Sequence, residues 1–334
     1  MIRQLPGTLL TLALSGSQLA IGQSAQNTTQ SHCAAAKAAA GAEHASLYAR
    51  FTPICSETAE PARGQGRQGG GTGAGRGAAP APPPRDAWYH EPAKVFDNLY
   101  FIGTRVHNAW ALQTSDGLII IDSLYAYAAK DEQIDGLRKI GLNPATMKYL
   151  IISHGHGDHH GGAKLLQDEF GPRVVMGGPD WDLVAKSLTI PPPKRDIVAS
   201  EAQKITLGDT TVTIYLTPGH TDGTLSLVIP VKDNGRPLFI ATWGGTALSR
   251  ATPPASLQAY VDSAVRYRAL LAKLGVEGMI SNHNEFDGAV TKISRLASRK
   301  AGEPHPFLSG ADSVRRYMTV VEEVGRAALA LPRP

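Results

Sequence analysis

Residues 154–162 read His154-Gly155-His156-Gly157-Asp158-His159-His160-Gly161-Gly162. This stretch lies between two segments of opposite character. Residues 147–153 are apolar and partly β-branched, which is typical of a buried strand, and residues 161–170 have the composition of a helix. Histidines and an aspartate are therefore concentrated in one tight turn from strand to helix, whose glycines let the backbone bend closely.

The spacing within this turn indicates a metal site. Alternate residues of an extended segment point the same way, so His154 and His156 can present nitrogens to one ion. Asp158 and His159 follow one short step later and can reach a second ion beside it. Imidazoles and a carboxylate are the ligands of catalytic zinc sites, where one position stays open for water. The alternative is a polar loop whose histidines face solvent, and five ionisable residues within seven positions argue against it.

This pattern resembles the His-x-His-x-Asp-His signature of the metallo-β-lactamase superfamily of zinc hydrolases. The resemblance extends from about Val95 to the region after His283, with the motifs in the family's order. It implies an αββα sandwich, in which two packed mixed β-sheets are flanked by helices. The sequence pattern alone predicts mixed α and β structure with two sheets. The expected strands are 95–96, 99–102, 109–112, 117–122, 147–153, 173–176, 211–216, 224–229 and 238–241, and the expected helices are 128–140, 161–170, 256–274 and 313–329.

Two further histidines complete the ligand sets that the resemblance implies. Pro218-Gly219-His220-Thr221 resembles the family segment that supplies the third histidine of the first site. His283, at the end of a short strand segment, is the corresponding ligand of the second site. The implied sets, for two Zn²⁺ ions per chain, are His154, His156 and His220, and Asp158, His159 and His283. Four other histidines match no role in the family or lack distinguishing neighbours, and are interpreted as non-site or surface residues: His90, His107, His160 and His305.

The same resemblance gives Asp122 a supporting role at the end of an apolar strand segment. The corresponding aspartate of the family steadies the histidine loop by hydrogen bonding and does not bind metal; a plain turn residue is the alternative. Many members, including the glyoxalase II thioesterases, place a metal-bridging aspartate after the strand equivalent to 238–241. Residues 242–246 read Thr-Trp-Gly-Gly-Thr instead, as in the subclass B3 β-lactamases, which lack that carboxylate. Thr246 and Ser249 are then candidates for substrate binding, with ordinary loop hydroxyls as the alternative.

The resemblance implies metal-assisted hydrolysis. A hydroxide shared between the two zinc ions, with a pKa lowered to roughly 7, would attack a carbonyl group that the metal polarises. Asp158 is predicted to be catalytic as well as a ligand, because it is the only carboxylate in the two sets. A cyclic amide, namely a β-lactam, is the first expected substrate. Lactones, esters or thioesters are the second, and a non-catalytic zinc-binding interaction protein is the third reading, which the complete ligand sets disfavour.

The length and composition limit the kinds of partner that the protein can be expected to have. The chain of 334 residues has room for one large domain or two small ones. Lys and Arg total 33 against 29 for Asp and Glu, and this small, dispersed excess does not indicate a nucleic-acid partner. The early apolar run is too short for a membrane span. The expected partner is a small-molecule substrate, and the sequence does not indicate an oligomeric state.

The N-terminal region is predicted to lie outside the catalytic domain. Residues 1–22 resemble a secretory signal peptide, which implies a periplasmic or secreted protein; an ordinary disordered N-terminus is the alternative. Residues 23–60 are expected to form a helical appendage, residues 61–84 a Gly- and Pro-rich linker, and residues 85–334 the catalytic domain. In an exported protein Cys33 and Cys55 predict a disulfide; no histidine cluster surrounds them to complete a metal site.

Overall fold

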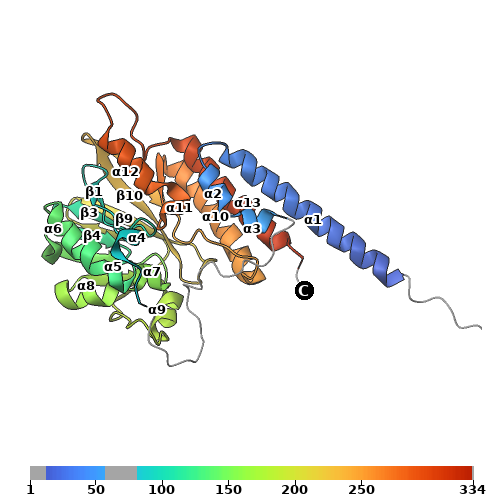
Figure 1. Cartoon of the computed structure of the whole chain (residues 1–334), viewed down its shortest axis with the longest axis horizontal. Coiled ribbons are helices and arrows are strands. Elements are labelled where there is room, and N and C mark those ends of the chain that lie inside the picture. The colour runs from blue at the N-terminus through green and yellow to red at the C-terminus, as the bar shows by residue number, and fades with distance from the viewer. Residues whose placement is uncertain (1–12, 57–80, 333–334) are drawn as a thin grey trace, which may run out of the picture.

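The computed structural model describes residues 13–56 and 81–332, with side chains from residue 27 onwards. Two β-sheets pack face to face, and helices cover the outer face of each sheet (Figure 1). This four-layer arrangement is the αββα sandwich that the family resemblance implied.

The first sheet contains seven strands in sequential order. They are β1 (Ala93–Lys94), β2 (Leu99–Phe101), β3 (Trp110–Thr114), β4 (Gly117–Ile121), β5 (Met147–Ile151), β6 (Arg173–Met176) and β7 (Ile197–Val198). Pairing is antiparallel from β1 to β4 and parallel from β4 to β7. Strand β4 is buried on both faces: Ile119 and Ile121 point between the sheets, whereas Leu118 and Ile120 face the outer helices.

The second sheet has five strands in the order β12-β11-β10-β9-β8. They are β8 (Gln203–Leu207), β9 (Thr210–Leu216), β10 (Leu225–Asp233), β11 (Arg236–Thr242) and β12 (Gly278–Ile280). Pairing is antiparallel except between β11 and β12, so this sheet is mixed too. Asn234 and Gly235 connect β10 to β11, both with positive φ, as a tight hairpin turn requires.

Helices pack on both outer faces. Apolar residues of α5, η1, α6, α8 and α9 share a core with the first sheet, and those of α10 and α13 share one with the second. The third core, between the sheets, includes residues of α12. The bounds are α4 (Arg85–Trp88), α5 (Ala126–Ala129), η1 (Lys130–Asp135), α6 (Gly136–Lys139), η2 (Pro144–Thr146), α7 (Gly157–His160), α8 (Ala163–Phe170), α9 (Gly178–Ala185), α10 (Pro254–Leu274), α11 (Asn284–Asp287), α12 (Ala289–Ala297) and α13 (Ala311–Ala330).

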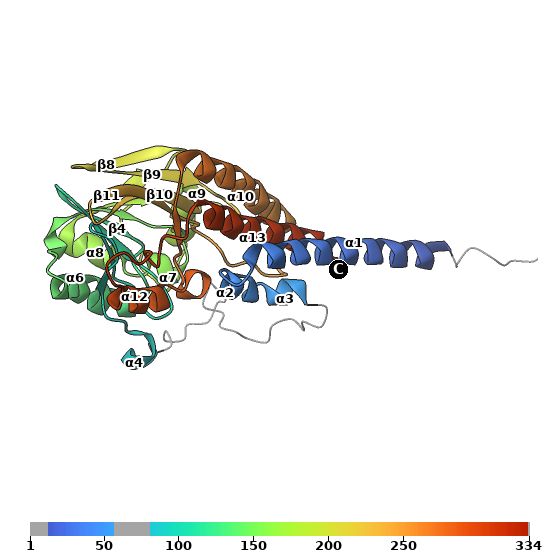
Figure 2. The same ribbon diagram turned by 90° about the horizontal axis from the view of Figure 1, so that it is seen from above.

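The N-terminal helices lie against the domain. They are α1 (Ala13–Ala40), α2 (Ala45–Ala49) and α3 (Thr52–Cys55), and α1 runs along α13 (Figures 1 and 2). Leu47, Phe51 and Ile54 are buried in the same core as Tyr317 of α13. The described part of the expected appendage is thus packed onto the expected catalytic domain. The domain limits themselves stay a prediction, since residues 1–12 and 57–80 lie outside the described residues.

The disulfide expected between Cys33 and Cys55 is present in the structure. It ties α1 to α3 across a sequence separation of 22 residues. We expect Cys33→Ser to lower the free energy of unfolding by about 3 kcal/mol, because the bond restricts the unfolded chain. Denaturant unfolding of both proteins under non-reducing conditions measures this difference. Equal stabilities would show that the bond does not contribute to holding the N-terminal helices.

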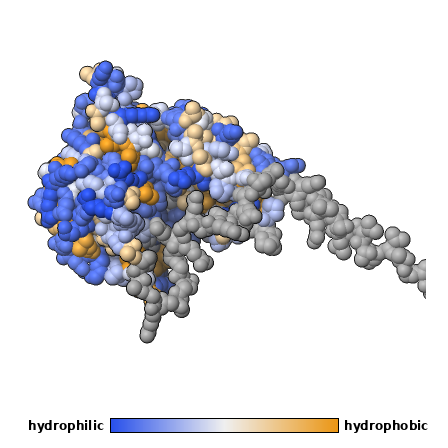
Figure 3. All heavy atoms as spheres, viewed as in Figure 1, coloured by the Kyte–Doolittle hydropathy of each residue, from blue (hydrophilic) through white to orange (hydrophobic). Residues whose placement is uncertain are grey.

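The surface carries no broad apolar face in the view of Figure 3, where apolar residues form separate patches among hydrophilic ones. Among the described helices, none combines the length and the hydropathy that crossing a membrane requires.

Candidate metal centre

The histidine loop leaves the first sheet at the end of β5 and continues into α7. Its backbone also contacts the second sheet, since the carbonyl of Ser153 accepts a 2.8 Å hydrogen bond from the N–H of Leu225. The loop therefore lies at one end of the sandwich, where segments from both sheets meet.

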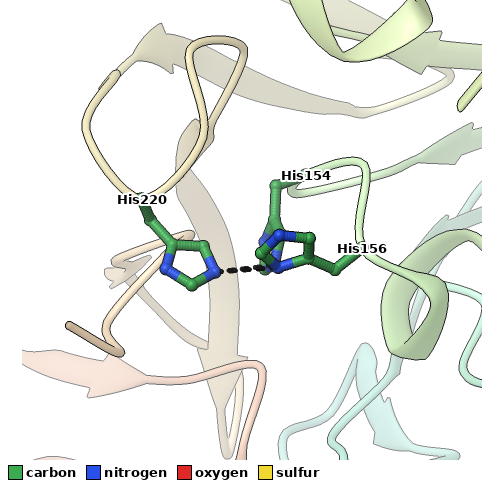
Figure 4. A group of neighbouring side chains, drawn as sticks. All are labelled: His154, His156 and His220. Carbon is green, nitrogen blue, oxygen red and sulfur yellow. Dashed lines mark hydrogen bonds between the residues drawn. The ribbon is translucent and has the colours of Figure 1, made fainter. Parts of the chain in front are cut away.

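Three histidines converge in the first cluster (Figure 4). Nε2 of His220 lies 3.1 Å from Nε2 of His154 and 3.1 Å from Nδ1 of His156. His154 and His156 come from the loop after β5, and His220 comes from the loop between β9 and β10. The structure thus brings together the three residues predicted to hold the first ion.

Hydrogen bonds on the far sides of two rings determine which nitrogens face this cluster. Nδ1 of His154 donates to the carbonyl of Gly244 at 2.8 Å, and Nδ1 of His220 donates to the carbonyl of Ala247 at 2.7 Å. Burial, together with the neighbouring histidines, lowers the pKa of His154 and lowers that of His220 to about 3, so both rings are neutral. Their Nε2 atoms then present lone pairs to each other, and a cation between them removes the repulsion. The donor set therefore fits a metal ion.

The second cluster lies beside the first and contains the other predicted ligands. Oδ2 of Asp158 is 3.2 Å from Nε2 of His159 and 3.2 Å from Nε2 of His283, and these two nitrogens are also 3.2 Å apart. The His154 and His159 ring centroids are separated by 4.1 Å, which places the two clusters side by side. Three ligand atoms in a small triangle are the arrangement that a single ion requires.

The second cluster attracts positive charge. Burial opposes ionisation of the Asp158 carboxylate, but the adjacent His159 and the hydrogen bonds from His159 and His283 outweigh it and hold its pKa well below the usual range. Burial likewise opposes a charge on His159, but Asp158 and Asp122 outweigh it and raise the pKa of His159 to about 10. A site that holds a proton this strongly has the negative character that a cation-binding site needs.

Asp122 supports this cluster from behind. Its Oδ2 accepts hydrogen bonds from Nδ1 of His159 at 3.0 Å and from Oγ of Ser153 at 2.9 Å, and its Oδ1 accepts one from the N–H of Ser153 at 2.7 Å. Asp122 has φ of 60°, a left-handed conformation that aspartate tolerates better than most residues. The structure places Asp122 in the supporting position predicted from the sequence, where it orients His159 and the start of the histidine loop.

We expect Asp122→Ala to weaken metal binding at the second cluster by about 10- to 100-fold, because His159 loses the acceptor that fixes its ring. Competition of the folded variant with a zinc chelator measures the affinity. Asp116→Ala, an exposed aspartate next to the same sheet, is the matched control. An Asp122→Ala protein that binds zinc as tightly as the wild type would remove this supporting role.

Asp180 was not identified in the sequence, although it connects the two loops of the first cluster. This buried residue lies in α9. Its Oδ2 accepts hydrogen bonds from the N–H of Gly155 and from Oγ1 of Thr221, both at 2.7 Å, and its Oδ1 accepts one from the N–H of Gly223 at 3.1 Å. Nothing in the sequence around Asp180 signals this role, because all three partners are distant along the chain.

The loop that carries His220 also requires a glycine before the histidine. Gly219 has φ of 141°, and a Cβ at this position would lie 2.4 Å from Cα of Tyr260 in α10. Any larger residue would push α10 or the loop aside, which explains the Pro-Gly-His order of this turn.

The surface interpretation was wrong for two of the histidines that sequence analysis set aside. His107 is only 8 % exposed, and its Nε2 lies 3.6 Å from Oδ2 of Asp158. His305 is 4 % exposed and stacks on Phe96 with 4.2 Å between ring centroids. His160 is also buried, with Nδ1 donating to the carbonyl of His156. Only His107 among these three adds a nitrogen to a cluster of candidate ligands.

The two predicted substrate contacts have different surroundings. Thr246 is 1 % exposed and its Oγ1 is buried, so its hydroxyl is not available to a substrate in this structure. Ser249 is exposed, and its Oγ accepts a 3.2 Å hydrogen bond from the N–H of Ala251 within its own loop. A substrate contact by Ser249 stays a prediction.

The fold and the site together define a class of protein: an αββα sandwich with a cluster of three histidines beside a cluster of two histidines and an aspartate at one end. Residues 102–233 match the sequence model of the Metallo-beta-lactamase superfamily. This part of the chain is therefore similar to the domain of that superfamily, in agreement with the sequence motifs.

Comparisons with individual proteins show the same similarity. The chain is similar to the crystal structure of BJP-1, a subclass B3 metallo-β-lactamase of Bradyrhizobium japonicum, with 29 % identity, a TM-score of 0.60, and coverage of 70 % of this chain and 92 % of that one. It is 31 % identical over 140 residues to a hydroxyacylglutathione hydrolase of Neisseria meningitidis, covering 40 % of this chain and 49 % of the relative. It is 27 % identical over 135 residues to the N-acyl homoserine lactonase AttM of Agrobacterium fabrum, covering 36 % and 50 %. The chain thus spans about half the length of these two curated relatives.

Proposed function

We propose that this protein is a dinuclear zinc hydrolase that cleaves the amide bond of a β-lactam. The observation that carries the proposal is the pair of clusters, each with three ligand atoms spaced for one ion. The similarity to a B3 β-lactamase over 92 % of that enzyme's length supports the choice of substrate. The absence of a carboxylate in residues 242–246 also fits the B3 pattern.

Zinc bound at such a site lowers the pKa of a coordinated water to about 7 and polarises a carbonyl oxygen. His154, His156 and His220 would hold one ion, and Asp158, His159 and His283 the other. The residues behind the ligands keep this geometry rigid. Asp122 orients His159, and Asp180 joins the two loops of the first cluster. Nδ2 of Asn282 donates to the carbonyl of Gly244 at 2.7 Å, and the same carbonyl accepts the hydrogen bond from His154. Such preorganisation is what makes electrostatic stabilisation effective in an active site.

A lactone with an apolar side chain is the second candidate substrate. This candidate is favoured by two apolar side chains, Leu183 and Ile190, that lie close to the backbone of the metal loop. A Cβ on Gly155 would lie 3.1 Å from Leu183, and a Cβ on Gly157 would lie 2.5 Å from Ile190. Leu183 is 43 % exposed, so part of its apolar side chain faces solvent. Apolar side chains presented beside the site suit an acyl chain, and a lactonase is among the relatives.

Turnover by the zinc-loaded protein tests these proposals. The panel is a chromogenic β-lactam, an N-acyl homoserine lactone and an acyl-glutathione thioester, each with metal-free protein as the control. We expect kcat/KM to be largest for the β-lactam and to fall to background when zinc is removed. A larger kcat/KM for the lactone would replace the first candidate by the second. A zinc-loaded protein inactive on the entire panel would contradict the hydrolase proposal and favour a non-catalytic zinc-binding role.

We also propose that the protein acts in the periplasm or outside the cell. The Cys33–Cys55 disulfide supports this, because disulfides persist in oxidising compartments. Intact mass of protein isolated from the periplasm tests it. We expect a mature chain that starts near residues 23–26 with both cysteines oxidised; a mass that retains Met1 would contradict export by cleavage.

A further inference from the structure

We infer that His107 is a fourth ligand of the second metal site, in addition to Asp158, His159 and His283. The two sites would then differ, with three protein ligands at the first ion and four at the second. This inference rests on the proposed two-metal centre but not on the identity of the substrate.

The backbone holds His107 next to a predicted ligand. His107, in the loop between β2 and β3, forms an antiparallel bridge with His283. The N–H of Asn108 donates to the carbonyl of Asn282, and the N–H of Asn284 donates to the carbonyl of Val106, both at 2.9 Å. Residues opposite each other in an antiparallel pair have neighbouring side chains, and the two imidazole centroids are 5.0 Å apart.

The loop is also fixed from within. Oγ1 of Thr104 accepts hydrogen bonds from the N–H of His107 at 2.8 Å and from the N–H of Val106 at 3.1 Å. The N–H of Thr104 in turn donates to the carbonyl of His107 at 2.7 Å. Because both the N–H and the carbonyl of His107 are hydrogen-bonded, its side chain is held in one orientation, as a metal ligand needs to be.

The side chain of His107 faces the second cluster. Its Nε2 lies 3.6 Å from Oδ2 of Asp158, and the residue is 8 % exposed. The ring of Tyr125 packs edge-on against it at 5.2 Å between centroids. The contact with Tyr125 and the proximity of Nε2 to the Asp158 carboxylate direct the imidazole of His107 toward the second cluster.

The distances suit one four-coordinate ion. Ligand atoms of Asp158, His159 and His283 are 3.2 Å from one another, and the edge of a zinc tetrahedron with bonds of about 2.1 Å is about 3.4 Å. Ligand atoms of His107, Asp158 and His283 also lie within 4.8 Å of one another. The two triplets share Asp158 and His283, so His107 supplies a fourth nitrogen to the same group.

A difference in the number of protein ligands would give the two metal sites different roles. Zinc sites with four protein ligands are closed, whereas a catalytic site keeps a position open for water. The three-histidine site would provide that open position, and the site with His107 would hold its ion more tightly. The second site should therefore load first as zinc is added to metal-free protein.

The experiment compares zinc binding by the wild type with that of His107→Ala, His107→Gln and His90→Ala. His90, in the segment before β1, belongs to neither cluster and is the matched control. Circular dichroism of each metal-free protein first establishes that it is folded, and His107→Gln replaces His107→Ala if the latter is not. Zinc stoichiometry and affinity are then measured by chelator competition, and the visible spectrum of the Co²⁺-substituted protein reports the ligands.

We expect His107→Ala to weaken binding of one of two ions at least ~10-fold and to change the Co²⁺ spectrum, while His90→Ala changes neither. Glutamine is a poor zinc ligand but keeps a hydrogen-bond donor, so His107→Gln should behave like His107→Ala. Full affinity in folded His107→Ala, or in His107→Gln, would overturn the assignment of His107 as a ligand. A wild-type protein that binds fewer than two ions would instead contradict the two-metal centre itself.

Discussion

Asp158→Asn is expected to lower turnover at least ~10²-fold and to reduce the zinc content from about two ions per chain toward one. Asp158 is the carboxylate among the six ligands predicted from the sequence, so it supplies the negative charge of the pair of sites. The asparagine amide has nearly the same size but no charge, and it is a poor zinc ligand. His159 and His283 would then face each other with no carboxylate between them.

The first cluster should largely survive this change, because Asp158 belongs to the other group of ligand atoms. Metal analysis beside steady-state kinetics on the folded variant measures both effects. Asp168→Asn, at an exposed aspartate paired with Lys164 in α8, is the control and should retain both ions and full turnover. Two ions retained by Asp158→Asn with near-normal turnover would remove Asp158 from the site.

His220→Ala is expected to have an effect of at least the same size, ~10²-fold or more in turnover. His220 contributes one of the three nitrogens of the first cluster, and it is the member that comes from the second sheet. With only two neighbouring nitrogens left, the three-ligand geometry of a catalytic zinc is lost. The affinity for one ion should fall while the Asp158 cluster keeps its own.

Zinc titration of His220→Ala and of Asp158→Asn distinguishes the two sites, because each variant should lose a different ion. The Co²⁺-substituted proteins should accordingly show different residual spectra. Identical residual spectra for the two variants would contradict two separate sites.

The sequence predicted much of the sandwich because its signals are local. The apolar runs of β4 and β5 are buried on both faces, so they are recognisable without knowledge of their neighbours. Helices α10 and α13 were expected at residues 256–274 and 313–329, and they are observed at Pro254–Leu274 and Ala311–Ala330. Strands β7 and β8 were missed, because β7 has only two residues and β8 contains only two apolar side chains, Ile205 and Leu207. The expected helix 128–140 contains a π-helical segment, η1, that no residue pattern indicated.

The candidate ligands were predictable for a similar reason. His154, His156, Asp158 and His159 lie within one short motif, and His220 and His283 each follow a strand. His107 was missed because its proximity to Asp158 depends on a backbone pairing with His283, far along the chain. Thr246 was chosen by its place in the sequence, but the structure turns its hydroxyl into the core.

The packing of the N-terminal helices also could not be predicted from the sequence. Residues 23–60 were expected to be helical, but α13, against which α1 packs, lies at the other end of the chain. Side chains such as Phe51 and Tyr317 share a core only because the fold brings segments from opposite ends of the sequence together. Long-range contacts of this kind leave no periodic signal in either segment.

The most direct test of the metal centre is anomalous scattering at the zinc absorption edge from crystals of the zinc-loaded protein. We expect two peaks at one end of the sandwich. One should lie among His154, His156 and His220, and the other among Asp158, His159 and His283. A single peak, or zinc bound away from these side chains, would contradict the two-metal centre.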